Sequence, residues 1–302
     1  MSFDTQAYVQ GVVSTSKIII FTVIPYFLLA ELLLYLDLMP VIAQVFEPFT
    51  SLLSLPPEAA LALASGIFLN LYAAIAFAAP LDLSVYHWTI LGLFLGVIHG
   101  IPVESAVMKK LGIDWLHSIL FRLIMAFVVV MPLLLIPSEL LFANPDLIQV
   151  STYQVHTSAP DTWLDFVLTK SLEAISLSIQ IILLIALVLL LTTWLKGLRV
   201  LSKFNHHLSA VMALITGVLI GITYGAGVLI KEAKFMSRKQ VLSVCYFLMV
   251  AHALIEDTLL FVFFGADALL LITIRLLVGL IVFALIYLYY PKDEAPIQLP
   301  KS

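Results

Sequence analysis

Charged residues are scarce in this sequence of 302 amino acids. Lys, Arg, Asp and Glu make up 11% of it, hydrophobic types make up 62%, and the mean hydropathy is +1.12. Soluble domains carry about 25% charged residues, so an ordinary cytosolic enzyme and a nucleic-acid binder with a basic face are excluded. Disorder is excluded as well, because it requires low hydrophobicity and high charge. The composition predicts an all-α integral membrane protein whose first partner is the lipid bilayer.

Cysteine is almost absent too. The single Cys245 lies in an apolar run and can form no internal disulfide. Nucleophile–base spacings, phosphate-binding loops and HExxH or CxxC signatures are missing, so we expect neither an enzyme nor a resident cofactor. Residues 1–12 lack Lys and Arg, and the apolar run 13–38 is too long for a secretory signal. We therefore expect that run to remain as a spanning helix.

Apolar stretches long enough to cross a bilayer occur eight times along the chain. They fall at about 13–38, 57–80, 84–110, 114–137, 165–195, 207–230, 238–264 and 267–290. Two of them contain residues that disfavour a simple spanning helix. Stretch 57–80 holds Ser65, Gly66 and Asn70, and stretch 207–230 holds Gly217, Gly221, Gly225 and Gly227. These two stretches are predicted to be broken, re-entrant elements.

The chain repeats itself at a fixed offset. Five polar or glycine positions of the first half recur 153 residues later: His99, Glu104, Gly112, Asp114 and Arg122 become His252, Asp257, Gly265, Asp267 and Arg275. Chance similarity between apolar helices would match Leu and Val rather than these rare residue types. The register therefore indicates an internal duplication.

The distribution of basic residues orients the two copies. Most Lys and Arg fall at 109–110, 196–203, 231–239 and 292–301, while none occurs between Lys17 and Lys109 or within 138–161. Positively charged loops stay in the cytoplasm, so segment 207–230 must enter and leave by the inner face. Each copy then has three transmembrane helices plus one re-entrant helical hairpin, and the second copy is inverted. Parallel repeats with four crossings each would place 231–239 outside and are less favoured.

This topology divides the chain into four parts with both termini inside. Residues 1–137 form the first membrane repeat, 138–161 an external loop, 162–290 the second, inverted repeat, and 291–302 a cytoplasmic tail. The composition and the charge distribution together place the protein in the cytoplasmic (inner) membrane as a multi-pass protein. The oligomeric state stays open, a homo-oligomer included.

Ionisable residues at mid-membrane depth form the candidate site, because a charge is costly there unless it is paired or serves a function. His99 and His252 fall halfway along their stretches. The register of the helical hairpins places Glu104 level with Arg122, and Asp257 level with Arg275, which predicts two buried ion pairs. Glu256 lies four residues after His252 and shares its helix face. These groups either bind a solute or only hold the helices together, and the sequence leaves both readings open.

The two Gly-x-Asp turns are expected to be structural. Gly112 and Gly265 suit the left-handed position after a helix end, and Asp114 and Asp267 suit the N-caps of the next helices.

The same cluster offers weak metal candidates. His99 and His252, with Glu104 and Asp257, form a His₂-carboxylate₂ set suited to iron, manganese or zinc. The two Arg residues compete for the carboxylates, and a membrane histidine is more often a hydrogen-bonded helix partner. Further substrate-binding candidates are the tips of the re-entrant stretches, namely Asn70, Tyr72, Thr223 and Tyr224.

A glycine-rich re-entrant stretch followed by a basic inner loop and a polar mid-membrane helix resembles the Gate domain, also called the nucleoside-recognition domain. Nucleoside transporters, ferrous-iron permeases and spore maturation proteins share this domain. Two copies would cover nearly the whole chain, with Gly66 to Arg122 and Gly217 to Arg275 as their cores. The resemblance implies a membrane permease built from inverted halves. The chain lacks the fused GTPase domain of iron permeases and is shorter than typical nucleoside transporters, so neither substrate carries over.

The sequence as a whole predicts a transporter of a small polar or ionic solute, nucleoside-like or an ion, working by alternating access at the repeat interface. A divalent-metal permease and a non-transporting membrane scaffold are the alternatives. The coupling ion, H⁺ or Na⁺, and the direction of transport are left open.

Overall fold

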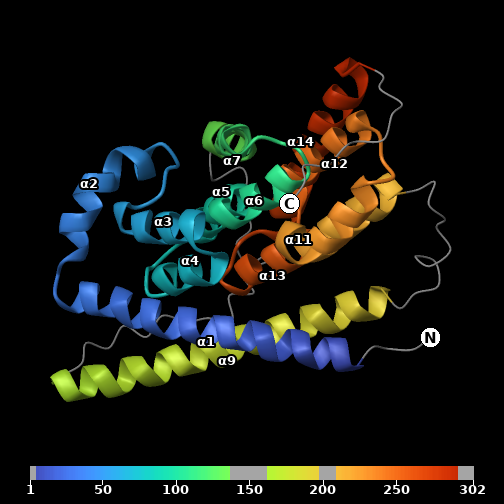
Figure 1. Cartoon of the computed structure of the whole chain (residues 1–302). Coiled ribbons are helices and arrows are strands. Elements are labelled where there is room, and N and C mark those ends of the chain that lie inside the picture. The colour runs from blue at the N-terminus through green and yellow to red at the C-terminus, as the bar shows by residue number, and fades with distance from the viewer. Residues whose placement is uncertain (1–4, 137–161, 197–208, 292–302) are drawn as a thin grey trace.

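The computed structural model describes residues 5–136, 162–196 and 209–291. The predicted external loop, nearly all of the predicted tail and part of the basic 196–203 stretch lie outside these residues. All regular structure in the described part is helical (Figure 1). The elements are α1 (Thr5–Tyr35), α2 (Met39–Ser51), η1 (Pro57–Ala59), α3 (Ala60–Phe68), α4 (Leu71–Ala78), α5 (Val85–Ile98), α6 (Ile101–Lys110), α7 (Trp115–Leu135), α9 (Trp163–Lys196), α11 (Ser209–Ala233), α12 (Arg238–Ala251), α13 (Leu254–Phe263) and α14 (Ala268–Tyr289).

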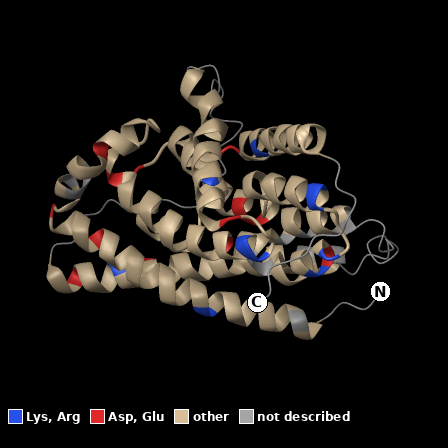
Figure 2. Cartoon of the chain, turned by 45° about the horizontal axis from the view of Figure 1, so that its top comes forward, with Lys and Arg blue, Asp and Glu red and all other residues tan. Residues whose placement is uncertain are grey.

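Six segments of the described chain are long and apolar enough to cross a membrane. They are Tyr8–Tyr35, Val85–Lys110, Trp115–Leu135, Trp163–Leu191, Arg238–Phe263 and Ala268–Tyr289. The two stretches predicted to be re-entrant are not among them. The prediction of a helical, multi-pass membrane protein is confirmed at this level, and Figure 2 shows how little of the ribbon carries charge.

Two of the six segments form the centre of the molecule. The buried share of the apolar window is 78% in α5–α6 and 67% in α12–α13, against 22–33% in the other four segments. Large apolar side chains of the outer helices, such as Phe21, Leu183 and Leu277, are exposed. In a bilayer these side chains face lipid, and the central pair is shielded from it.

Both central segments break at a histidine. α5 ends before His99 and α12 ends before His252, and each is followed by a residue in the left-handed region, Gly100 at φ +55° and Ala253 at φ +45°. Pro102 in the first turn of α6 contributes to the first break, because proline has no N–H to donate. The second break forms without glycine or proline.

The two glycine-bearing stretches are also broken. α3 and α4 are separated at Asn70, whose side chain accepts a hydrogen bond from Ala73 N–H at 3.0 Å and so caps α4. α11 is interrupted at Gly221, whose φ of +84° and ψ of 172° are open to glycine. Each broken stretch is tied to a central break by one main-chain hydrogen bond: Gly100 N–H donates to the Gly66 carbonyl, and Ala253 N–H donates to the Gly217 carbonyl.

The two central segments run antiparallel to each other. Trp88 near the start of α5 stacks on Phe264 just after α13, the rings of His99 and His252 lie 5.1 Å apart, and Arg238 at the start of α12 donates to the Gly112 carbonyl after α6. α1 and α9 lie side by side and are antiparallel as well (Figure 1), since Tyr8 donates to the Ala186 carbonyl and Tyr35 packs on Phe166.

Candidate functional site

The two helix breaks meet in the interior and gather five buried polar residues. Glu104 and Arg122 come from the first half, and Asp257, Arg275 and His252 from the second, each with 3% of its surface exposed or less. His99 lies beside them. The structure thus brings together six of the ten residues that the 153-residue register singled out: both histidines, Glu104, Asp257 and both arginines.

Each arginine closes the break of its own half. Arg122 Nε donates to the Val97 carbonyl at 2.8 Å, and its Nη2 donates to the His99 carbonyl at 2.9 Å. Arg275 does the same with the Val250 and His252 carbonyls, at 3.2 and 2.6 Å. Carbonyls at a helix end lack intrahelical partners, and a guanidinium with its fixed fork of donors satisfies two at once.

Both predicted ion pairs are present in the structure. Arg122 Nη2 lies 2.5 Å from Glu104 Oε2, and Arg275 Nη2 lies 3.2 Å from Asp257 Oδ2. Arg275 also donates to the Gly96 carbonyl of the other half at 2.6 Å. The two pairs therefore anchor the breaks, and through Arg275 the second pair also contacts the first half.

The histidines share one tautomeric constraint. His99 Nδ1 lies 2.8 Å from the Leu95 carbonyl, and His252 Nδ1 lies 2.8 Å from the Leu248 carbonyl. A carbonyl oxygen only accepts, so each Nδ1 must carry the proton and donate it. In the neutral form each ring then presents the unprotonated Nε2 to its other side.

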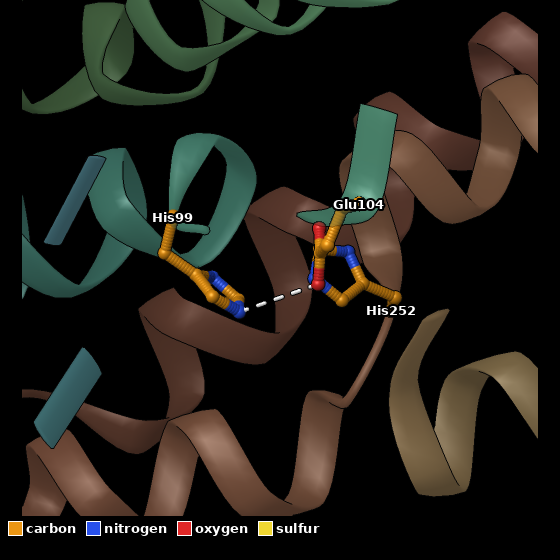
Figure 3. Close-up of side chains that lie close together, drawn as sticks. All are labelled: His99, Glu104 and His252. Atoms are coloured by element: carbon orange, nitrogen blue, oxygen red, sulfur yellow. Dashed lines mark ion pairs between the residues drawn. The ribbon is translucent and has the colours of Figure 1, made fainter. Parts of the chain in front are cut away.

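Glu104 lies between the two rings. Its Oε1 is 3.5 Å from His99 Nε2 and 3.2 Å from His252 Nε2, so the carboxylate of one half reaches the histidine of the other (Figure 3). Asp257 is one methylene shorter, and within the described residues its ion pair is with Arg275 and with neither histidine. The duplication is therefore asymmetric at its centre.

A second contact joins the halves at the same level. The Tyr72 hydroxyl of α4 donates to Glu256 Oε1 of α13 at 3.1 Å. Glu256 forms no ion pair with any described Lys or Arg. Thr223 and Tyr224 lie on α11 just after the break at Gly221, and their side chains lie outside what the structure describes.

These groups surround a cavity of about 270 Å³. Its lining comes from both halves and includes nearly all of the predicted substrate-binding residues: Asn70, Tyr72, His99, Glu104, His252, Glu256 and Asp257. Gly100 and Gly221 complete the wall at two of the breaks. Typical small-molecule pockets measure roughly 300–1,000 Å³, so this cavity suits a small polar solute or an ion.

The predicted turn residues lie outside the cavity, at helix ends. Gly112 and Gly265 adopt φ values of +81° and +107°. Asp114 accepts from the N–H groups of the first turn of α7, and Asp267 accepts from Leu270 N–H at the start of α14.

Several contributors to the site were not predicted from the sequence, among them Ile18 and Gly96. Ile18 of α1 lines the cavity, and nothing in the sequence marks it. Gly96 lets the Arg275 guanidinium pack against the backbone, since a Cβ there would lie 2.8 Å from Nη1. The spacing of Gly92 and Gly96, four residues apart on an apolar helix, is a signal of close helix approach that could have found it.

One relative is similar over most of both chains: the "Uncharacterized membrane protein YvoD" of Bacillus subtilis (strain 168). It is 32% identical over 267 residues, which cover 84% of this chain and 84% of the relative. No protein-family model matches the chain, and no solved structure matches it significantly. By this identity and coverage, the chain belongs to the same membrane-protein family as YvoD of Bacillus subtilis.

Proposed function

We propose that this protein is a cytoplasmic-membrane transporter that carries a small polar or ionic solute through the cavity between its two halves. The observation that carries the proposal is the cavity itself. It lies where two broken, antiparallel central helices cross, and it combines ionisable side chains with tips of broken stretches from both halves. Discontinuous helices that meet at mid-depth are the recurrent solute site of secondary transporters.

The two halves are inverted copies, with both termini inside. The antiparallel packing of α5–α6 on α12–α13 and of α1 on α9 supports the inversion, because each of these helices lies against its own counterpart. The basic residues at 109–110 and 231–239 support the orientation. The plan is the one implied by the Gate-domain resemblance, which we retain as part of the proposal.

Alternating access follows from rocking of one half against the other around the cavity. Three polar contacts cross the interface beside the cavity: Tyr72 to Glu256, Glu104 to His252, and Arg275 to the Gly96 carbonyl. The hydrogen bonds that Tyr72 and Arg275 donate here can be exchanged for bonds to a solute at small net cost. Glu256, which forms no ion pair with a described residue, is the carboxyl that a cationic or hydrogen-bonding solute would meet.

Purified full-length protein in liposomes tests the proposal. Thermal unfolding is first measured with uridine, Co²⁺ and inorganic phosphate as probes, and uptake of any stabilising probe is then followed in proteoliposomes. We expect saturable uptake that falls at least tenfold in Glu256→Gln. The matched control is Glu58→Gln, which lies before α3 and outside the cavity.

A membrane scaffold is the alternative function, and the same experiment distinguishes a scaffold from a transporter. A scaffold gives no uptake above protein-free liposomes for any stabilising probe, and its Glu256→Gln variant changes assembly or stability alone. That result would overturn the transport proposal.

A further inference from the structure

The centre of the cluster is an arrangement of three acceptor atoms. Both histidines donate Nδ1–H to a main-chain carbonyl, so their Nε2 lone pairs point toward Glu104 Oε1, itself an acceptor (Figure 3). Three such atoms repel one another unless a cation lies among them. Either protons or a metal ion can supply that charge.

We propose that this cation is a divalent first-row transition-metal ion, bound by His99 Nε2, His252 Nε2 and Glu104 Oε1. That this ion is the transported solute rests on the proposed function. That the ion binds at these three residues rests on their geometry alone.

The two distances from Glu104 to the histidines fit a tetrahedral site. With metal–nitrogen and metal–oxygen bonds near 2.0–2.1 Å, two ligands of a tetrahedron lie about 3.3 Å apart. The measured separations from Glu104 Oε1 are 3.5 and 3.2 Å, and one ligand atom of each of the three residues lies within 4.8 Å of the others.

The surroundings match those of metal ligands. Ligating histidines usually donate their second ring N–H to a carbonyl or carboxylate, as Nδ1 does here in both rings. Arg122 pairs with Glu104 Oε2, whereas Oε1 is the oxygen nearest the two Nε2 atoms, so the guanidinium orients the carboxylate rather than competing for both oxygens.

The donor set also selects the class of ion. Two imidazoles and one carboxylate favour first-row transition metals over Mg²⁺ and Ca²⁺, which prefer oxygen ligands. The fourth side of the cluster faces the cavity, where a carried ion keeps an exchangeable ligand. Glu256, which forms no ion pair with a described Lys or Arg, adds a further carboxyl group to the cavity wall.

Titration of the purified full-length protein with Co²⁺ tests the site. Calorimetry measures the stoichiometry and affinity, and visible absorption reports the geometry, because tetrahedral Co²⁺ absorbs far more strongly than octahedral Co²⁺. We expect one Co²⁺ per chain with a tetrahedral spectrum, and competition by Zn²⁺ but not by Mg²⁺.

The variants are chosen to keep the fold. His252→Asn and His99→Asn retain a side-chain N–H near the Nδ1 position and remove Nε2, so the bond to the carbonyl can survive. Each should weaken Co²⁺ binding at least about 100-fold, beyond the 10–100-fold typical of an outer-shell change. His117→Asn, an exposed histidine at the start of α7, is the matched control and should bind as the unaltered chain does.

Two results would overturn the metal inference. One is the absence of saturable Co²⁺ binding, which leaves protons as the cation in the cluster. The other is equal binding by His252→Asn and the unaltered chain. The two proposals fail separately: Co²⁺ binding without uptake of any probe removes transport alone, whereas uptake of uridine without Co²⁺ binding removes the metal alone.

Discussion

At the scale of single residues, the buried ion pairs decide how the site is held. Glu104 and Arg122, like Asp257 and Arg275, are removed from solvent, and each arginine also satisfies carbonyls freed by a helix break. A buried charge that loses its partner is far more costly than an exposed one. The pairs are therefore part of the fold as well as of the cavity wall.

Asp257→Asn should lower the free energy of unfolding by about 3–5 kcal/mol, because it leaves the buried Arg275 uncompensated. The double variant Asp257→Asn/Arg275→Gln should lose less than the sum of the two single variants. Thermal unfolding in detergent measures both. Asp114→Asn is the control, since Asn caps a helix about as well as Asp does. Equal midpoints for Asp257→Asn and Asp114→Asn would show that the pair is not buried in the membrane protein.

The residues of the cluster were predictable because charge is so rare in this chain. The 153-residue register singled out the histidines, the acids and the arginines, and helical geometry paired Glu104 with Arg122. The contact of Glu104 with His252 was not predictable, because it depends on how closely the halves approach. Nor could the sequence show that Asp257, one methylene shorter, stays with Arg275 alone.

At the scale of elements, the breaks and the close approach of helices shape the cavity. The sequence marked the breaks at Asn70 and Gly221 by polar and glycine residues. Nothing in the sequence marks the break after His252, because no glycine or proline follows it and Ala253 is not a residue that favours φ of +45°. Tertiary contacts hold it: Ala253 N–H donates to the Gly217 carbonyl, and Arg275 binds the His252 carbonyl.

Gly96→Ala should destabilise the protein by about 1–3 kcal/mol, as overpacking in a tight interior does. The added Cβ would lie 2.8 Å from Arg275 Nη1 and would push the guanidinium off the carbonyls. Gly227→Ala on α11 meets nothing within 4 Å and, being helical, should be neutral or slightly stabilising. Unfolding midpoints of the two variants provide the comparison. A Gly96→Ala protein as stable as Gly227→Ala would mean that α5 and α14 pack less closely than described.

At the scale of the whole molecule, helices that correspond in the two halves lie antiparallel against each other. Trp88 meets Phe264, His99 meets His252 and Gly112 meets Arg238, so the contacts progress in opposite directions along the two central segments. Under the proposed inversion, an approximate two-fold axis in the membrane plane accounts for this pattern. The ends that carry Lys110 and Lys234 lie together, where Arg238 donates to the Gly112 carbonyl, and Asp82 precedes α5 at the opposite end of the first central segment. Parallel copies would separate Lys110 from Lys234.

Single cysteines in a Cys245→Ala background test this arrangement, since native Cys245 is buried and gives little label itself. Asp82→Cys, Lys110→Cys and Lys234→Cys all lie at exposed positions. With a membrane-impermeant maleimide on intact cells, we expect labelling of Asp82→Cys alone, because positively charged ends stay in the cytoplasm. Permeabilised cells should label all three, which controls for reactivity. Labelling of Lys234→Cys but not of Lys110→Cys in intact cells would place 231–239 and 109–110 on opposite sides and require parallel repeats, and the shared site would then lose its two-fold relation.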